Sequence, residues 1–231
     1  MDIIIFAAIA FYLFFKLNKQ LGKIDEEEKR DIEAKIINIK SSQKPKSQAP
    51  DKIIGYKTTK DSQFNSQNAE LFTDSEIQNL DNSSKKALKD ILQKLQITNQ
   101  FFIEGAKTAF ESILRAFAAD ELQKVKFLLS DKIYQGFKDV NDKRKAQGKS
   151  LVTNIISFDE VCVMSANIDN NFALIAVKFI SQQINYISNS QGDIIVGSKD
   201  EINQVEDIWT FKKDLKSNNP NWIVNNTDYN I

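Results

Sequence analysis

The sequence predicts an α+β protein in which helices come first, a curled antiparallel sheet follows, and an N-terminal membrane helix precedes both. Between residues 80 and 148, apolar side chains recur at spacings of three and four, which is typical of helices. From Leu151 onward the spacing changes to two, as in strands that bury one face. An uncharged apolar run near the N-terminus is the third observation. We divide the chain into a membrane anchor at 1–23, an amphipathic or stalk helix at 24–40, a flexible linker at 41–79 and the α+β domain at 80–231.

The uncharged run from Ile3 to Phe15 is the expected anchor. Its thirteen residues are fewer than the roughly 20 of a bilayer span, but the stems of Lys16 and Lys19 extend the apolar surface by snorkelling. The basic residues follow the run, so the positive-inside rule places Met1 outside and the remaining chain in the cytoplasm or its organellar equivalent. The alternatives are a buried helix of a soluble fold and a cleaved signal peptide. The residues expected in the membrane are Ile3, Ile4, Ile5, Phe6, Ile9, Phe11, Tyr12, Leu13, Phe14 and Phe15.

The next two segments connect the anchor to the domain. Ile32, Ile36 and Ile39 share one helical face among balanced charges, which favours a solvated stalk over a helix that lies on the membrane or on a partner. Between residues 41 and 79 the chain holds two of its three prolines and few apolar residues. This composition predicts a flexible linker that lets the domain reach across the membrane surface.

Four helical patterns open the predicted domain. The first begins near Ser83 or Ser84 as N-cap, and the second spans 101–120. Asp120 is expected to start the third helix, with Gln123 completing a capping-box-like pair. The fourth helix is expected to stop at Gly148.

Composition excludes several kinds of function. The 31 basic and 31 acidic residues balance, which removes the electrostatic footprint of a nucleic-acid binder. There is no His, so imidazole-based triads and His-ligated metal sites are excluded. Cys162 is alone and lies in an apolar stretch typical of a structural thiol. Phosphate loops, nucleophile elbows and metal-ligand clusters are also missing from the sequence, so we predict neither an enzyme nor a cofactor.

Two groups of polar residues are candidate sites. Asp207 shares a strand face with Val205, Trp209 and Phe211, and it is the best candidate for a buried general base; Glu160 is a weaker one. The simpler interpretation of Asp207 is a carboxylate that hydrogen-bonds a neighbouring turn. A basic cluster could contact anionic lipid, although an ordinary helix end with cations that favour the dipole explains it better. This cluster comprises Lys143, Arg144, Lys145 and Lys149.

An ordered series of stretches carries a family resemblance. "FFIEGAKTAF", "LLSDKIYQGF", "GDIIVGS" and "VEDIWTFKKD" followed by "NPNWIVNNT" resemble the C-terminal domain of the family of subunit 44 of the mitochondrial inner-membrane import translocase and its bacterial relatives. The resemblance runs from about Leu95 to Thr227. One departure is Ala119, where the family pattern usually has Gly before the helix-starting Asp.

The resemblance implies a cone-shaped domain, related to nuclear transport factor two, with a concave sheet and an apolar pocket. It also implies inner-membrane association, because mitochondrial members tether an Hsp70-type chaperone to the import channel. We therefore predict a scaffold on the bacterial inner membrane, single-pass with a cytoplasmic domain, that binds a protein partner or a lipid acyl chain. The alternatives are the mitochondrial inner membrane facing the matrix, an isomerase-like enzyme of the same fold, and a pure lipid-binding module. The predicted pocket residues, for which core packing is the rival explanation, are Tyr134, Phe137, Trp209, Phe211 and Trp222.

Overall fold

The computed structural model describes residues 71–227, which form helices followed by an antiparallel sheet that does not close on itself. The α+β prediction is therefore confirmed. The predicted anchor at 1–23, the stalk at 24–40 and the linker up to residue 70 lie outside the described residues. Within 71–227, no helix has both the length and the hydropathy that crossing a bilayer requires.

The helices are α3 (Asp74–Ile77), α4 (Asn82–Leu95), α5 (Asn99–Ala118), the 3₁₀ helix η2 (Leu122–Leu128) and α6 (Asp131–Ala146). The four described α-helices are capped at their N-termini by side chains that accept hydrogen bonds from backbone N–H groups, with Thr73, Asp81, Thr98 and Ser130 as caps. The cap of α4 is Asp81 rather than Ser83 or Ser84, since a carboxylate with two oxygens accepts both from the backbone N–H of Ser84 and from the serine hydroxyls.

The ordered domain extends further toward the N-terminus than the predicted boundary at residue 80. Thr73 and Glu76 form a capping box that starts α3, and Ile77 is buried. Leu71 and Phe72 pack against the same core, and the carbonyl of Leu71 accepts a hydrogen bond from the backbone N–H of Asn99. Short polar helices such as α3 lack the apolar repeat that the sequence prediction relied on.

The turn between α5 and η2 also differs from expectation. Asp120 has a left-handed backbone, with φ of 59°, and does not cap a helix. The element that follows is a 3₁₀ helix with no side-chain cap, so the predicted capping pair of Asp120 and Gln123 is wrong. Gln123 instead accepts a hydrogen bond from the Tyr134 hydroxyl. Gly148, with φ of 63° just after α6, is confirmed as the helix stop.

The sheet contains β1 (Ser150–Asp169), β2 (Phe172–Ser188), β3 (Ile194–Gly197), β4 (Asn203–Asp214) and β5 (Ile223–Asn226). Its order is β1-β2-β4-β5, with β3 paired to one end of β2, and every pairing is antiparallel. The register of β2 with β4 is continuous from Phe172↔Asp214 to Gln183↔Asn203. Residues paired directly across these strands therefore project from the same face.

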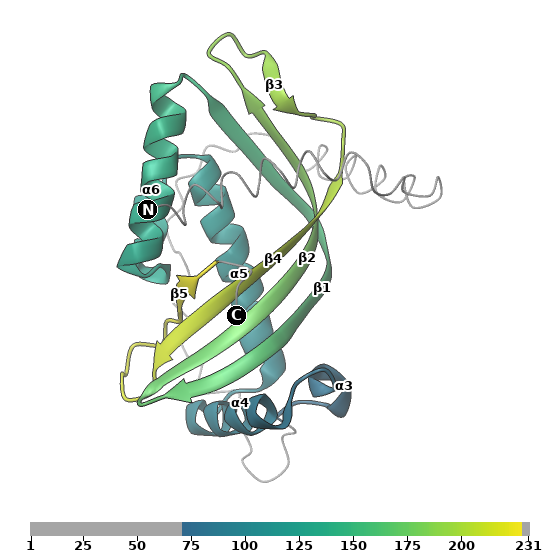
Figure 1. The fold of residues 1–231 in the computed structure, drawn as a ribbon, viewed down its shortest axis with the longest axis vertical. Helices are drawn as coiled ribbons and strands as arrows, with labels where there is room; N and C mark the ends of the chain where they lie inside the picture. The colour runs from purple at the N-terminus through teal and green to yellow at the C-terminus, as the bar shows by residue number, and fades with distance from the viewer. Residues whose placement is uncertain (1–70, 228–231) are drawn as a thin grey trace, which may run out of the picture.

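The edge strand β1 is the irregular one. Its register against β2 shifts three times, between Ile155 and Ser157, between Phe158 and Glu160, and between Val163 and Ser165. Each shift places an extra residue on β1, and such bulges bend a strand and increase its twist. The long strands are accordingly bowed along their length, as Figure 1 shows.

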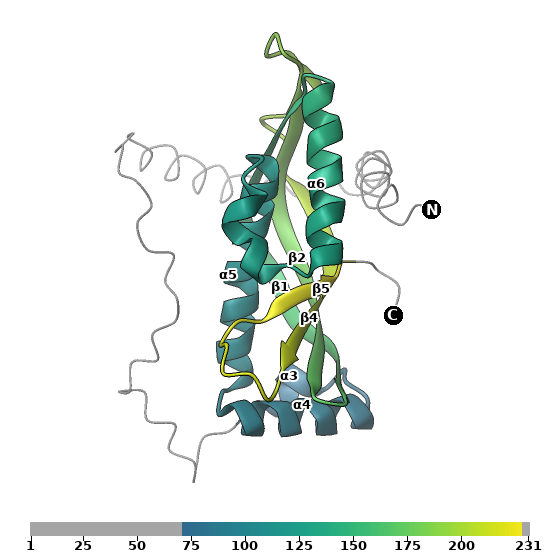
Figure 2. The ribbon, with the colours of Figure 1, turned by 90° about the vertical axis from the view of Figure 1, so that its left-hand side faces the viewer.

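The helices lie on the concave face of the bent sheet. Figures 1 and 2 show α5 running along the sheet, α6 beside β5, and α4 across the lower end. The core between α5 and the sheet is apolar and includes Phe110, Ile113, Ile175, Val177 and Phe179. This arrangement defines the helix-facing side of the sheet, on which the predicted strand residues Asp207, Trp209 and Phe211 lie.

Candidate functional site

The helix-facing side of the sheet divides into an aromatic half and a polar half. In the aromatic half, Phe110 of α5 stacks on Phe179 with 4.3 Å between ring centroids and lies 4.6 Å from the Trp209 ring. Phe102 contacts Phe211 edge-on at 6.0 Å and Trp222 at 4.9 Å. Rings in such tilted and edge-on arrangements add to the stabilisation from area burial alone.

The five predicted pocket residues all join the hydrophobic core. Trp209 and Phe211 are almost fully buried, at 3% and 1% exposure, and Tyr134 is 9% exposed. Phe137 and Trp222 are partly buried against the same cluster. Both tryptophans thus form sheet core, and the role of these five residues in lining a pocket stays a prediction.

The polar half lies further along the same face and was not foreseen from the sequence. Ser181, Gln183 and Asn185 alternate with outward-facing residues on β2, and all three are at most 2% exposed. Gln183 donates to Ser181 Oγ at 2.8 Å, and Asn185 donates to Gln183 Oε1 at 3.0 Å. Among the described residues, neither Asn185 Oδ1 nor Asn203 Nδ2 has a hydrogen-bond partner. Unpaired buried amide groups are costly, so this half retains capacity for further hydrogen bonds.

Asp207 lies at the boundary between the aromatic half and the polar half. It pairs across the sheet with Phe179, and its side chain is only partly exposed. Burial, together with the neighbouring charge of Glu206, raises the pKa of the Asp207 carboxyl to about 7. No residue in the described range donates a hydrogen bond to it, so the expected turn contact is not formed there. A carboxyl with a pKa near neutrality can both accept and release protons, which is the property of a general base.

The weaker candidate, Glu160, lies elsewhere. Its carboxylate forms an ion pair with Lys178 at 3.0 Å and accepts a hydrogen bond from Cys162 Sγ at 3.1 Å. Burial and the Glu160 carboxylate raise the pKa of the Cys162 thiol to about 11, so the thiol stays protonated near neutral pH. This supports the structural assignment of Cys162.

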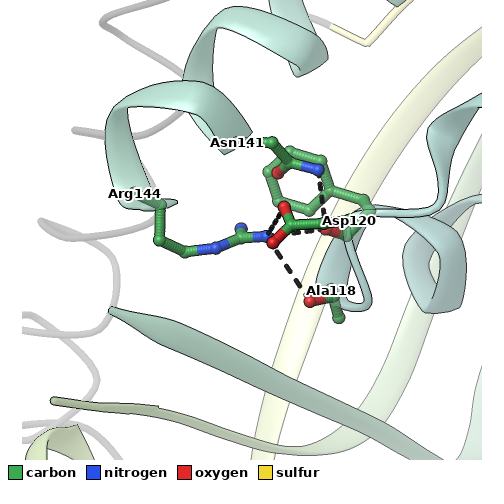
Figure 3. Close-up of polar contacts among 5 residues, drawn as sticks. Ala118, Asp120, Asn141 and Arg144 are labelled. Carbon is green, nitrogen blue, oxygen red and sulfur yellow. Dashed lines mark hydrogen bonds and ion pairs between the residues drawn. The ribbon is translucent and has the colours of Figure 1, made fainter. Parts of the chain in front are cut away.

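Arg144 lies in a different environment from the one expected for a lipid contact. Its side chain is 8% exposed, and Nη2 lies 2.8 Å from Asp120 Oδ1 and 2.8 Å from the carbonyl oxygen of Phe117 (Figure 3). Asn141 donates to the same carbonyl at 3.0 Å. Since the last carbonyls of α5 lack partners within the helix, Arg144 and Asn141 act as its C-terminal cap.

The remaining members of the basic cluster are positioned differently. Lys143 and Lys145 are exposed in the last turn of α6, where cations favour the helix dipole. Lys149 donates to Gln147 Oε1 at 2.7 Å. Lipid contact by these three lysines stays a prediction.

Comparison with known proteins places this fold in a family. A protein-family profile described as the Tim44-like domain matches residues 84–228, which is more than half of the chain. The chain belongs to the Tim44-like domain family. This family is involved in membrane-associated protein import, and the resemblance inferred from the sequence is confirmed.

Two further similarities accompany the family match. An uncharacterized protein of Rickettsia prowazekii is 23% identical over 98% of this chain and 96% of its own length. The intermembrane-space region of the chloroplast protein ARC6 is similar in structure at 10% identity and a TM-score of 0.38, over 55% of this chain and 94% of that one. Neither similarity adds a residue role to the Tim44-like domain described here.

Proposed function

We propose that this Tim44-like protein is a non-enzymatic scaffold that holds a protein partner beside a membrane. The supporting observation is the family match over residues 84–228, because the family takes part in membrane-associated protein import. The partner proposed is an Hsp70-type chaperone or a membrane-protein complex. The proposed location is the inner membrane of a bacterium, with the domain in the cytoplasm, and the alternative is the mitochondrial inner membrane facing the matrix.

The division of the chain supports this proposal. The predicted anchor and linker precede a domain whose core is packed from Leu71 onward and whose first described helix is capped by Thr73. A linker of about 30 residues spans roughly 30 Å on average, so a tethered domain would stay close to the membrane while meeting partners. Cone-shaped domains related to nuclear transport factor two present a concave sheet for such binding, and we extend that expectation to the helix-facing side of this sheet.

The test is chemical cross-linking of the tagged full-length protein in its native membrane, followed by mass spectrometry. A reproducible chaperone, translocase or membrane-protein set is expected in the cross-linked fraction. A matched sample of the tag alone controls for nonspecific capture. Recovery of lipid with no reproducible protein would contradict the scaffold role and favour a lipid-binding module.

Asp207 supports one second candidate, an acid–base enzyme such as an isomerase. The observation in its favour is a carboxyl of raised pKa that no described residue hydrogen-bonds, next to buried polar groups with unused capacity. The expected result under the scaffold proposal is no turnover of ketone substrates by the purified protein. Turnover that is lost in Asp207→Asn and kept in Asp200→Asn, an exposed control, would establish the enzyme instead.

A further inference from the structure

A pocket separate from the sheet core lies between three segments that are distant in the sequence. It has a volume of about 220 Å³ and is bounded by α3 and the turn after it, by the first turn of α5, and by four consecutive residues of β1. Its polar wall includes Glu76 and Asn99, and its apolar wall includes Ile103, Val161 and Val163. The pocket thus combines hydrogen-bonding groups with an apolar surface in a space suited to one long side chain.

Glu76 brings an uncompensated negative charge to this pocket. Burial alone would raise its pKa, but hydrogen bonds from the Thr73 backbone, the Asn99 side chain and the Thr73 hydroxyl hold the pKa below its usual 4.5. The carboxylate is therefore ionised at neutral pH. Within residues 71–227, no lysine or arginine forms an ion pair with it.

Asn99 supplies a second, independent indication that a ligand binds. It is 4% exposed, and its Nδ2 donates to Glu76 Oε1 at 2.9 Å, which fixes the orientation of the amide. Its Oδ1 is left without a hydrogen-bond partner among the described residues. A buried amide oxygen of this kind is satisfied by a guest that donates hydrogen bonds.

The opposite wall narrows the chemistry of the guest. Glu160 is already balanced by Lys178, and the Cys162 thiol is protonated, so neither provides a nucleophile or a free charge. In the described part of the chain, no three acidic or cysteine side chains are grouped closely enough to hold a metal ion. The free acceptor of Asn99 lies beside the Glu76 carboxylate, which has no ion-pair partner among the described residues. These two groups suit an organic cation, because an ammonium or guanidinium group carries only hydrogen-bond donors.

We propose that this pocket binds a lysine or arginine side chain of a partner polypeptide. The ammonium or guanidinium group lies at Glu76 and donates to Asn99, while the apolar stem lies along Ile103 and Val161. Charge complementarity selects a basic side chain, and the position of the pocket on the domain surface makes it reachable by a separate chain. This inference rests on the proposed scaffold function and assigns it a recognition site.

The test uses purified full-length protein and two labelled peptides. Both are short, polar and flexible, and they differ only in a central residue that is lysine in one and norleucine in the other. We expect the lysine peptide to bind about tenfold more tightly, as one charge-assisted hydrogen-bonded pair would give, and this preference to weaken with salt. Equal binding of the two peptides would overturn the proposal.

Two variants sharpen the result. Glu76→Gln removes the charge but keeps a residue type that capping boxes accept, and it should abolish the lysine preference without changing the melting temperature greatly. Asp74→Asn alters an exposed carboxylate on the same helix, outside the pocket lining, and should leave binding unchanged. An equal loss in both variants would point to nonspecific charge and overturn the assignment.

Two outcomes distinguish this site from the wider function. If the peptide preference appears only after Lys52, Lys57 and Lys60 are replaced by glutamine, the chain's own upstream segment is the occupant and the partner assignment is wrong. If Glu76→Gln keeps the full set of membrane cross-links and the peptides bind equally, the pocket proposal fails while the scaffold stands. Absence of reproducible protein cross-links in the unmodified protein would remove the scaffold itself.

Discussion

The two halves of the helix-facing sheet surface are built from the same strands but differ in chemistry. Around Phe110, Phe179 and Trp209, inward positions carry rings that pack against α5. Beyond Asp207 on the same continuous register, inward positions carry Ser181 and Gln183. Along β2, Phe179, Ser181 and Gln183 are equally buried, so burial does not by itself separate structural from functional surface. What distinguishes the two halves is whether their buried polar groups all have hydrogen-bond partners.

The largest effect is expected from breaking the aromatic half with Phe110→Ala. Phe110 is fully buried, so its truncation removes apolar contacts and leaves a cavity, costing about 4 kcal/mol in free energy of unfolding. Chemical denaturation measures the change. Phe127→Ala is the matched control, since Phe127 is 45% exposed and its loss should change stability little. Equal effects of the two substitutions would contradict the division into a packed and an exposed set of rings.

Asp207→Asn tests the polar half and is expected to act in the opposite direction at high pH. Because the folded-state pKa of about 7 lies above the usual 3.8, the folded protein holds a proton that the unfolded chain releases. Its contribution to stability is therefore complete below about pH 4 and is lost as the pH rises toward 7. The shift corresponds to at most about 4 kcal/mol, so Asp207→Asn should be the more stable protein at pH 8 and lose this pH dependence. Denaturant midpoints between pH 4 and 8 measure it, and unchanged pH dependence would show that Asp207 is solvated like a surface carboxylate.

Asp120→Asn is expected to lower the free energy of unfolding by less than Phe110→Ala does. Asp120 lies at the junction that fixes α6 beside α5. Asparagine tolerates the left-handed backbone at this position, so the substitution removes mainly the charge that pairs with Arg144. We expect about 1.5 kcal/mol of destabilisation in urea, because Arg144 is buried and keeps only the carbonyl contacts. Asp142→Asn, on the exposed side of α6, is the control. A neutral result at Asp120 would mean that the carbonyl contacts alone hold the junction.

The smallest effect should come from Gly105→Ala, which touches neither half. A β-carbon at residue 105 would meet no atom within 4 Å, and residue 105 lies inside α5. Alanine favours helix over glycine by about 0.5–1 kcal/mol, so a modest rise in melting temperature is expected. A fall would indicate that α5 needs a flexible point here, and the Phe110 result would then require reinterpretation.

Local pattern predicted the aromatic half well and the polar half poorly. The period of two placed Trp209 and Phe211 inward because strand alternation depends only on neighbours in sequence. The same rule assigns polar residues outward, so Ser181, Gln183 and Asn185 gave no signal of their burial. Contact between Asp120 and Arg144, 24 residues apart, follows from packing and has no local signature. Asp120 was misassigned since aspartate suits both a helix cap and a left-handed turn.

The candidate pocket was likewise outside the reach of local pattern. Glu76 lies in a short helix within the predicted linker, and Asn99 is the first residue of α5. Only the packing of α3 against the start of α5 brings the two side chains together. A capping-box pattern at Thr73 and Glu76 was the one sequence signal available, and it indicated a helix start without indicating a site.

The three bulges of β1 also bear on how the protein behaves at high concentration. The longest run of β1 with unbroken pairing is Ser150–Ile155, although the strand has 20 residues. A regular edge strand of 20 residues would offer a continuous template to which a second molecule could add a strand, and such pairing starts aggregation. Repeated interruptions leave a second molecule only short matching stretches. The irregularity that bends the sheet therefore also limits the addition of strands from one domain to the edge of another.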